Sequence, residues 1–84
     1  MNRIEFKFIE TSPASERSRT LLLTEKLSSQ QPSALFPDED DPELASLYKV
    51  EDVKDRDVST LLELLESQAC IEFAESQNMR RLIH

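Results

Sequence analysis

The sequence predicts one α+β domain whose elements follow the order strand, helix, strand, strand, helix, strand. Three patterns carry this prediction. Residues 3–10 alternate apolar and charged side chains, which is typical of a half-buried strand. Residues 55–68 repeat apolar side chains at helical spacing, and residues 69–75 alternate again. This order favours a four-stranded antiparallel sheet that carries both helices on one face, as two split β-α-β units.

The first predicted strand has two distinct faces. Its apolar face holds Ile4, Phe6 and Phe8, and its charged face holds Arg3, Glu5 and Lys7. Ile9 adds an apolar group to the charged side. Ser12 and Pro13 then predict a helix start, with Ser12 as N-cap and Pro13 at the first helical position. We expect this helix to end at Leu27 or Ser28. Its predicted apolar stripe is Leu22, Leu23 and Leu27, with Ala14 and Leu21 at the margin.

The middle of the chain predicts a loop followed by a strand. Residues 28–42 are rich in Ser, Gln, Pro and Asp, and Leu35 and Phe36 within them suit a short edge strand between prolines. Residues 44–53 form the next strand candidate. Its core face holds Tyr48 and Val50, and the opposite face holds Leu47, Lys49 and Glu51.

The last helix and strand complete the predicted fold. Either Asp55 or Asp57 can cap the helix, and its apolar stripe is Val58, Leu61, Leu62 and Leu65. In the last strand, alternation places Ile71 and Phe73 in the core, and Cys70, Glu72 and Ala74 on the other face. The expected architecture is therefore ferredoxin-like over residues 1–75, with an extended tail over residues 76–84.

Because both helices cover one face of the sheet, the other face is free to bind a partner. Small or apolar side chains predicted there are Ile9, Leu47, Cys70 and Ala74, beside the charged Lys7, Lys49 and Glu72. An apolar centre with a charged rim suits a protein interface. Scattered surface apolar groups, which are normal on soluble proteins, are the alternative interpretation.

Composition excludes several classes of function. The formal net charge of −7 argues against binding nucleic acid or an anionic membrane surface. The sequence contains no glycine, which argues against phosphate-cradling loops and nucleophile elbows. One cysteine, Cys70, and one histidine, His84, make neither a zinc site nor a supported catalytic triad. We therefore expect a protein without enzymatic activity, metal or cofactor.

The two ends of the chain carry different signals. The N-terminus has no signal-peptide core, which predicts a cytoplasmic protein if the chain is complete and a secreted one if it is a processed propeptide. The C-terminus mixes apolar and basic residues with nothing left to pack against. This predicted groove-binding tail is Met79, Arg80, Arg81, Leu82, Ile83 and His84.

Most of the chain resembles the propeptide of subtilisin-like serine proteases, the inhibitor domain that precedes the catalytic domain. The likeness is strongest over Leu47–Glu51, the helix at 58–68, and Ala69–Glu75. The last strand of that family follows the pattern valine, acid, aromatic, aliphatic, acid, which Ile71–Glu75 matches position by position. The first strand, Ile4–Ile9, and the first helix are similar to the family's opening.

This resemblance implies a function and a set of contacts. The free sheet face would pack on two surface helices of the protease, and Glu75 would cap a helix N-terminus there. Gln77 stands where the family carries a second acid. The tail would run through the substrate cleft as an added strand, with His84 in the first specificity subsite, Ile83 in the second and Arg81 in the fourth. The family often has an apolar residue in the fourth subsite, which Leu82 would supply if the register shifted by one.

The resemblance thus implies an inhibitor, and an intramolecular chaperone, of a subtilisin-like protease that acts in cis or in trans. The sequence also supports a second interpretation. A small ferredoxin-like subunit of a non-protease assembly would use the same sheet face for an interaction or for weak homodimerisation, through Ile9, Leu47 and Cys70. Inhibition assays and light scattering separate the two.

Overall fold

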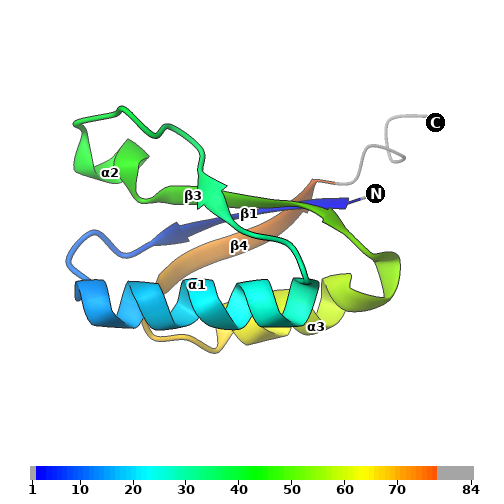
Figure 1. Cartoon of the computed structure of the whole chain (residues 1–84). Coiled ribbons are helices and arrows are strands. Elements are labelled where there is room, and N and C mark those ends of the chain that lie inside the picture. Colours follow the sequence, from blue (N-terminus) through cyan, green and yellow to red (C-terminus); the bar gives the residue numbers. More distant parts are fainter. Residues whose placement is uncertain (1, 78–84) are drawn as a thin grey trace.

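The fold is a four-stranded antiparallel sheet covered on one face by two helices (Figure 1). The computed structural model describes residues 2–77. Its elements are β1 (Asn2–Phe8), α1 (Ala14–Ser28), β2 (Ser33–Ala34), α2 (Pro42–Ala45), β3 (Leu47–Val53), α3 (Asp55–Glu66) and β4 (Ile71–Gln77). The strand order is β2-β3-β1-β4. The predicted ferredoxin-like fold is confirmed, with α1 and α3 on the same side of the sheet.

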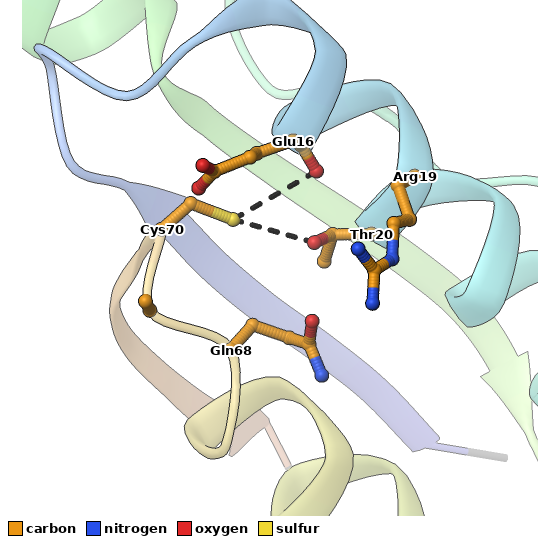
Figure 2. Close-up of a pocket in the computed structure, with 6 residues that line it drawn as sticks. Glu16, Arg19, Thr20, Gln68 and Cys70 are labelled. Carbon is orange, nitrogen blue, oxygen red and sulfur yellow. Dashed lines mark hydrogen bonds between the residues drawn. The ribbon is translucent and has the colours of Figure 1, made fainter.

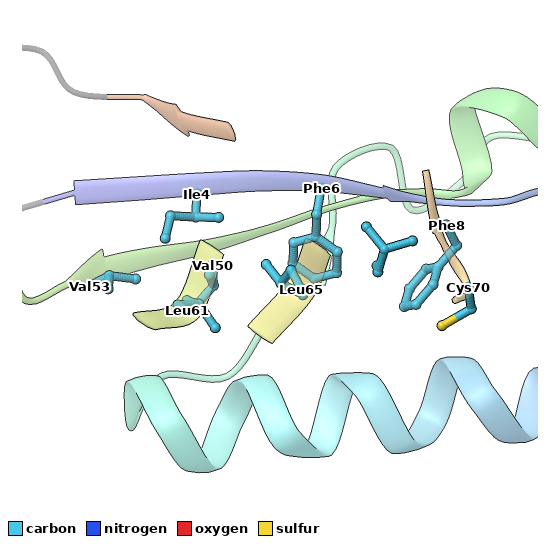
Figure 3. Close-up of a cluster of buried hydrophobic side chains, with 9 residues drawn as sticks. Ile4, Phe6, Phe8, Val50, Val53, Leu61, Leu65 and Cys70 are labelled. Carbon is cyan, nitrogen blue, oxygen red and sulfur yellow. The ribbon is translucent and has the colours of Figure 1, made fainter. Parts of the chain in front are cut away.

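The core forms around the central strand β1. Ile4, Phe6 and Phe8 are fully buried and project toward the helices, as their alternation predicts (Figure 3). Tyr48 of β3 stacks on Phe6 at 6.0 Å between ring centroids and meets Phe8 edge-on at 5.3 Å. Burying each such aromatic side chain stabilises the fold by about 1.5–3 kcal/mol.

Helix α3 packs by the stripe predicted from the sequence. Leu61 and Leu65 are fully buried, while Val58 and Leu62 are half-buried against them. The predicted N-cap is wrong, because Lys54 occupies that position and makes no side-chain cap. Asp55 and its neighbour Asp57 instead lie in the first turn, where a carboxylate interacts favourably with the helix dipole.

Helix α1 packs by a face that matches the predicted one only in part, since Leu27 and the marginal Leu21 lie half-buried against the core. Its buried residues are Thr20, Thr24 and Ser28, whereas Leu22 is exposed. The hydroxyl of Thr24 donates to the carbonyl of Thr20 at 2.9 Å, and that of Ser28 donates to the carbonyl of Thr24 at 2.7 Å. Because these hydroxyls are satisfied within the helix, they can be buried without losing hydrogen bonds. These small side chains share the core-facing side of the helix with Leu21 and Leu27, whereas the predicted Leu22 points to solvent.

The start of α1 also differs from the prediction. Pro13 occupies the N-cap position, and the Ser12 hydroxyl donates to the carbonyl of Ile9 at 2.6 Å. Arg17 secures this corner, since its guanidinium donates to the carbonyls of Ile9 and Glu10 at 3.0 Å each. The same guanidinium lies over the Phe8 ring at 5.3 Å from the centroid, which is a cation–π geometry.

The segment between α1 and β3 holds a short strand and a short helix. The predicted edge strand at Leu35 and Phe36 lies two residues earlier, at β2, although the Leu35 N–H still donates to the carbonyl of Leu47 at 2.9 Å. The predicted strand over 44–53 starts only at Leu47. Pro42–Ala45 forms α2 instead, because the Asp41 side chain accepts from the Glu43 N–H at 2.9 Å and caps it.

Strand β3 carries a bulge near its end. Ile4 pairs with Val50 but Asn2 pairs with Val53, so β3 has one more residue than β1 over this stretch. Asp52 adopts a left-handed backbone conformation at φ 60°, which Asp tolerates better than most residues. The bulge turns Val53 into the core, where it is fully buried.

Candidate binding face of the sheet

The face of the sheet away from α1 and α3, called the open face below, is the candidate functional surface. The register of the strands shows which residues lie on this face. Phe6 and Phe8 point to the helices, so Lys7 between them must point away. Three cross-strand rows result. They are Leu47–Lys7–Phe73, then Lys49–Glu5–Glu75, then Arg3 beside Gln77.

A second bulge, in β4, determines which β4 residues reach the open face. Phe8 pairs with Ile71, whereas Lys7 pairs with Phe73, so Glu72 is the extra residue. Beyond the bulge the alternation is reversed. The prediction that Phe73 lies in the core is therefore wrong: it is 40% exposed on the open face, opposite Lys7. Ala74, predicted for the open face, pairs with Phe6 and lies half-buried against the core.

Cys70 is also displaced from its predicted place on the open face. It precedes β4 and belongs to the hydrophobic core on the helix side. Its thiol lies 3.3 Å from the Thr20 hydroxyl and donates to the Glu16 carbonyl at 3.9 Å (Figure 2). A pocket of about 260 Å³ opens beside it, lined by Glu16, Arg19, Thr20, Gln68, Ala69 and Cys70. The buried thiol is thus a packing group between α1 and the α3–β4 turn.

The other predicted contact residues lie on or near the open face. Leu47 is half-buried beside Lys7, and Glu75 is exposed beside Glu5. Ile9 is exposed just beyond β1, where its N–H donates to the carbonyl of Cys70 at 2.8 Å. Gln77 ends β4 opposite Arg3. The apolar spot predicted from Ile9, Leu47 and Cys70 is therefore replaced by one centred on Leu47 and Phe73.

A half-buried ion pair lies at the centre of this surface. The Lys7 side chain is only 5% exposed, and its Nζ lies 2.8 Å from Glu72 Oε1 and 3.8 Å from Glu10 Oε2. The hydrogen bond to Glu72 raises the pKa of Lys7 above its ordinary value, against an opposing effect of burial, and the charges of Glu72, Glu10 and Glu43 add to the rise. Lys7 therefore stays protonated and holds the carboxylate of the bulge residue.

Over the rest of the open face, charged side chains form a network of exposed ion pairs. Arg3 lies 2.8 Å from Glu5 and 3.9 Å from Glu51, and Lys49 lies 2.8 Å from Glu51. The hydrogen bond from Lys49 lowers the pKa of Glu51. Exposed pairs of this kind contribute about 0–1 kcal/mol each, so they specify the charge pattern more than they stabilise the fold.

Other kinds of site find little support in the part of the chain that the structure describes. Within residues 2–77 no three His, Cys, Asp or Glu side chains gather in a way that could hold a metal ion. Over the same residues no helix is long and apolar enough to cross a membrane. The predicted tail residues Met79–His84 lie outside the described residues.

Comparisons of the chain with protein-family models, with curated proteins and with solved structures gave no significant match. The functional argument therefore depends on the chain's own residues and their arrangement.

Proposed function

We propose that this domain inhibits a subtilisin-like serine protease by docking its open sheet face on the enzyme and placing its C-terminal tail in the active-site cleft. The observation that carries the proposal is the position of β4. It is an edge strand that brings Phe73 and Glu75 to the open face and then leads, at Gln77, directly into the apolar and basic tail sequence.

The tail supplies the inhibitory part of this proposal. An extended peptide can pair with the edge of a protease cleft as an added β-strand, using main-chain hydrogen bonds for affinity and side chains for specificity. Residues 79–84 would bind in this way, with His84 in the first specificity subsite beside the catalytic serine. Inhibition then requires no chemical step on this chain.

The open face supplies the docking part. Glu75 is exposed on the last strand, where its carboxylate can accept hydrogen bonds from the free N–H groups at a helix N-terminus of the enzyme. Gln77, the last residue of β4, follows two residues later. A preformed sheet surface that binds the folded enzyme also stabilises that enzyme by mass action, which is how such a domain would assist folding.

The direct test is inhibition of purified subtilisin-like proteases by the whole chain and by a variant that lacks residues 79–84. We expect the whole chain to inhibit competitively and the truncated chain to lose at least tenfold in potency, because it retains only the docking surface. Circular dichroism of both proteins controls for folding. Equal potency of the two forms, or no inhibition by either, contradicts the proposal.

A second candidate function is an interaction subunit of a non-protease assembly, including a homodimer. The exposed Phe73 on the open face favours it, since a large aromatic group on a sheet suits any protein interface. Light scattering over a range of concentrations tests the homodimer. A mass that stays at 9.7 kDa up to millimolar protein rules it out, whereas a concentration-dependent doubling that Phe73→Thr abolishes supports it.

A further inference from the structure

The most unusual side chain on the open face is Phe73, because a bulge turns it out of the core. Without the extra residue Glu72, strict alternation from Ile71 would place Phe73 among the buried side chains. The bulge reverses this and leaves the ring 40% exposed beside Lys7. Bulges are often found where a strand re-aims a side chain for function.

The residues beside Phe73 in the sheet set the charge around its ring. Lys7 Nζ contacts Glu72 Oε1 at 2.8 Å, so a nearly buried cation anchors the residue just before the ring. Leu47 lies on the other side of Lys7 in the same cross-strand row. The stem of Lys7 thus lies between two apolar side chains and covers the sheet between them.

The charge that this region presents to solvent is negative. Glu10 and Glu72 are half-exposed, and Glu75 is exposed two residues beyond the ring on the same face. Lys7, the cation nearest to the ring, is only 5% exposed and is already paired. The charged groups nearest to the ring are therefore carboxylates, whereas the cations Lys49 and Arg3 lie in the adjoining rows and pair with Glu51 and Glu5. We call Phe73, Glu10, Glu72 and Glu75 the Phe73 patch.

We infer that the Phe73 patch is the centre of the docking surface, and that it fits a partner surface with an apolar socket flanked by lysine or arginine side chains. Aromatic groups surrounded by a polar rim supply most of the binding energy at many interfaces. The acidic rim selects a basic partner surface and accelerates association with it. This inference rests on the proposed function, because it assigns the contact surface for the proposed protease partner.

The experiment compares four single variants in the full chain, each as an inhibitor of the same subtilisin-like protease. Phe73→Thr removes the ring but keeps a residue that favours strands, and Leu22→Thr is its control because Leu22 is exposed on α1 on the opposite side of the sheet. Glu75→Lys reverses a charge in the patch, and Glu63→Lys does the same on the exposed side of α3.

We expect Phe73→Thr to weaken inhibition by about tenfold or more, and Leu22→Thr to change it less than about twofold. Glu75→Lys should weaken inhibition by about fivefold at low ionic strength, with most of the effect lost at about 0.5 M salt, whereas Glu63→Lys has no effect. Unchanged melting temperatures of Phe73→Thr and Glu75→Lys will show that the fold is intact.

Three failures are distinguishable. If the wild-type chain inhibits and Phe73→Thr inhibits equally well, the Phe73 patch is not the docking centre, although the proposed function stands. If Glu75→Lys strengthens inhibition, the partner surface is acidic and the inferred partner chemistry is wrong. If the wild-type chain inhibits no protease of this class, the proposed function is overturned and this inference with it.

Discussion

The two faces of the sheet use the same strands but are held by different forces. On the helix side, β1 contributes Ile4, Phe6 and Phe8, all fully buried against α3 and β3. On the open face, its other residues form ion pairs, and among these only Lys7 is nearly excluded from water. Apolar burial contributes about 25 cal/mol per Å², whereas exposed ion pairs contribute little. The helix side of the sheet therefore provides most of the stability, and the side chains of the open face are free to vary with the partner.

This difference makes a prediction about which substitutions affect the fold. Changes on the helix side should reduce stability, and binding should fall only because the folded fraction falls. Changes to exposed side chains of the open face should leave the folded fraction nearly constant, and the exception there is Lys7, which is nearly excluded from water. Five stability measurements, ordered by expected effect, test this separation.

The largest effect is expected from Phe6→Ala at the centre of the helix side. Phe6 contacts both Phe8 and Tyr48, at 5.8 and 6.0 Å between ring centroids. Removing the ring leaves a cavity and should cost about 3–5 kcal/mol of unfolding free energy. Urea denaturation followed by circular dichroism measures the loss. A cost below about 1 kcal/mol would show that the helix side is not the main source of stability.

Thr24→Leu on α1 should be the next most damaging change, although it makes the helix more apolar. Thr24 is fully buried and its hydroxyl is satisfied inside the helix. Two additional carbon atoms overfill this site, which typically costs about 1–3 kcal/mol. The matched control is Leu23→Ile in the half-buried flank of the same helix. A more stable Thr24→Leu protein would show that α1 packs loosely by another face.

Lys7 should contribute mostly through its stem. Lys7→Ala removes the buried methylenes as well as the charge, whereas Lys7→Met keeps most of the apolar length. We expect Lys7→Ala to be less stable than Lys7→Met by about 1–2 kcal/mol, at about 0.8 kcal/mol per buried methylene. Equal stabilities would mean that the charge, not the stem, accounts for the effect of Lys7.

The ion pair of Lys7 gives a separate pH signature. Because the folded-state pKa is raised above the ordinary value of 10.5, the pair stabilises the fold fully below that pH and is lost as pH rises through the raised pKa. Wild-type protein should therefore lose stability above about pH 10.5 more steeply than Lys7→Met. Parallel pH profiles of the two proteins would contradict this assignment.

The smallest effect is expected from Glu51→Gln on the open face. Since the pKa of Glu51 is lowered by Lys49, its contribution is present above the ordinary value of 4.5 and is lost as pH falls through the lowered pKa. At neutral pH the melting temperature should stay within measurement error of the wild type. A clear drop in melting temperature would indicate that the open face stabilises the fold after all.

Much of this architecture can be predicted from the sequence because its patterns are local. The alternation of residues 3–10 and the stripe of Leu61 and Leu65 each lie within one element, and the structure confirms both. Leu47 was likewise placed on the open face by alternation, whereas Glu75 reaches that face because of the bulge at Glu72. The leucine stripe of α1 was right for Leu27 and wrong for Leu22, because hydrophobicity alone does not reveal that hydroxyls bonded inside the helix can be buried beside the leucines.

The sequence by itself determined the order of the four strands and the two long helices, and the buried faces of β1 and α3. Only the tertiary structure decided where the two bulges lie. These bulges turn Val53 and Ala74 toward the core and Phe73 outward. The physical reason is that side chains alternate with period two, so one inserted residue exchanges the faces of everything beyond it. That insertion is defined by pairing between β1 and strands far away along the chain. Phe73, which we infer to be central for binding, is therefore a residue that alternation alone places on the wrong face of the sheet.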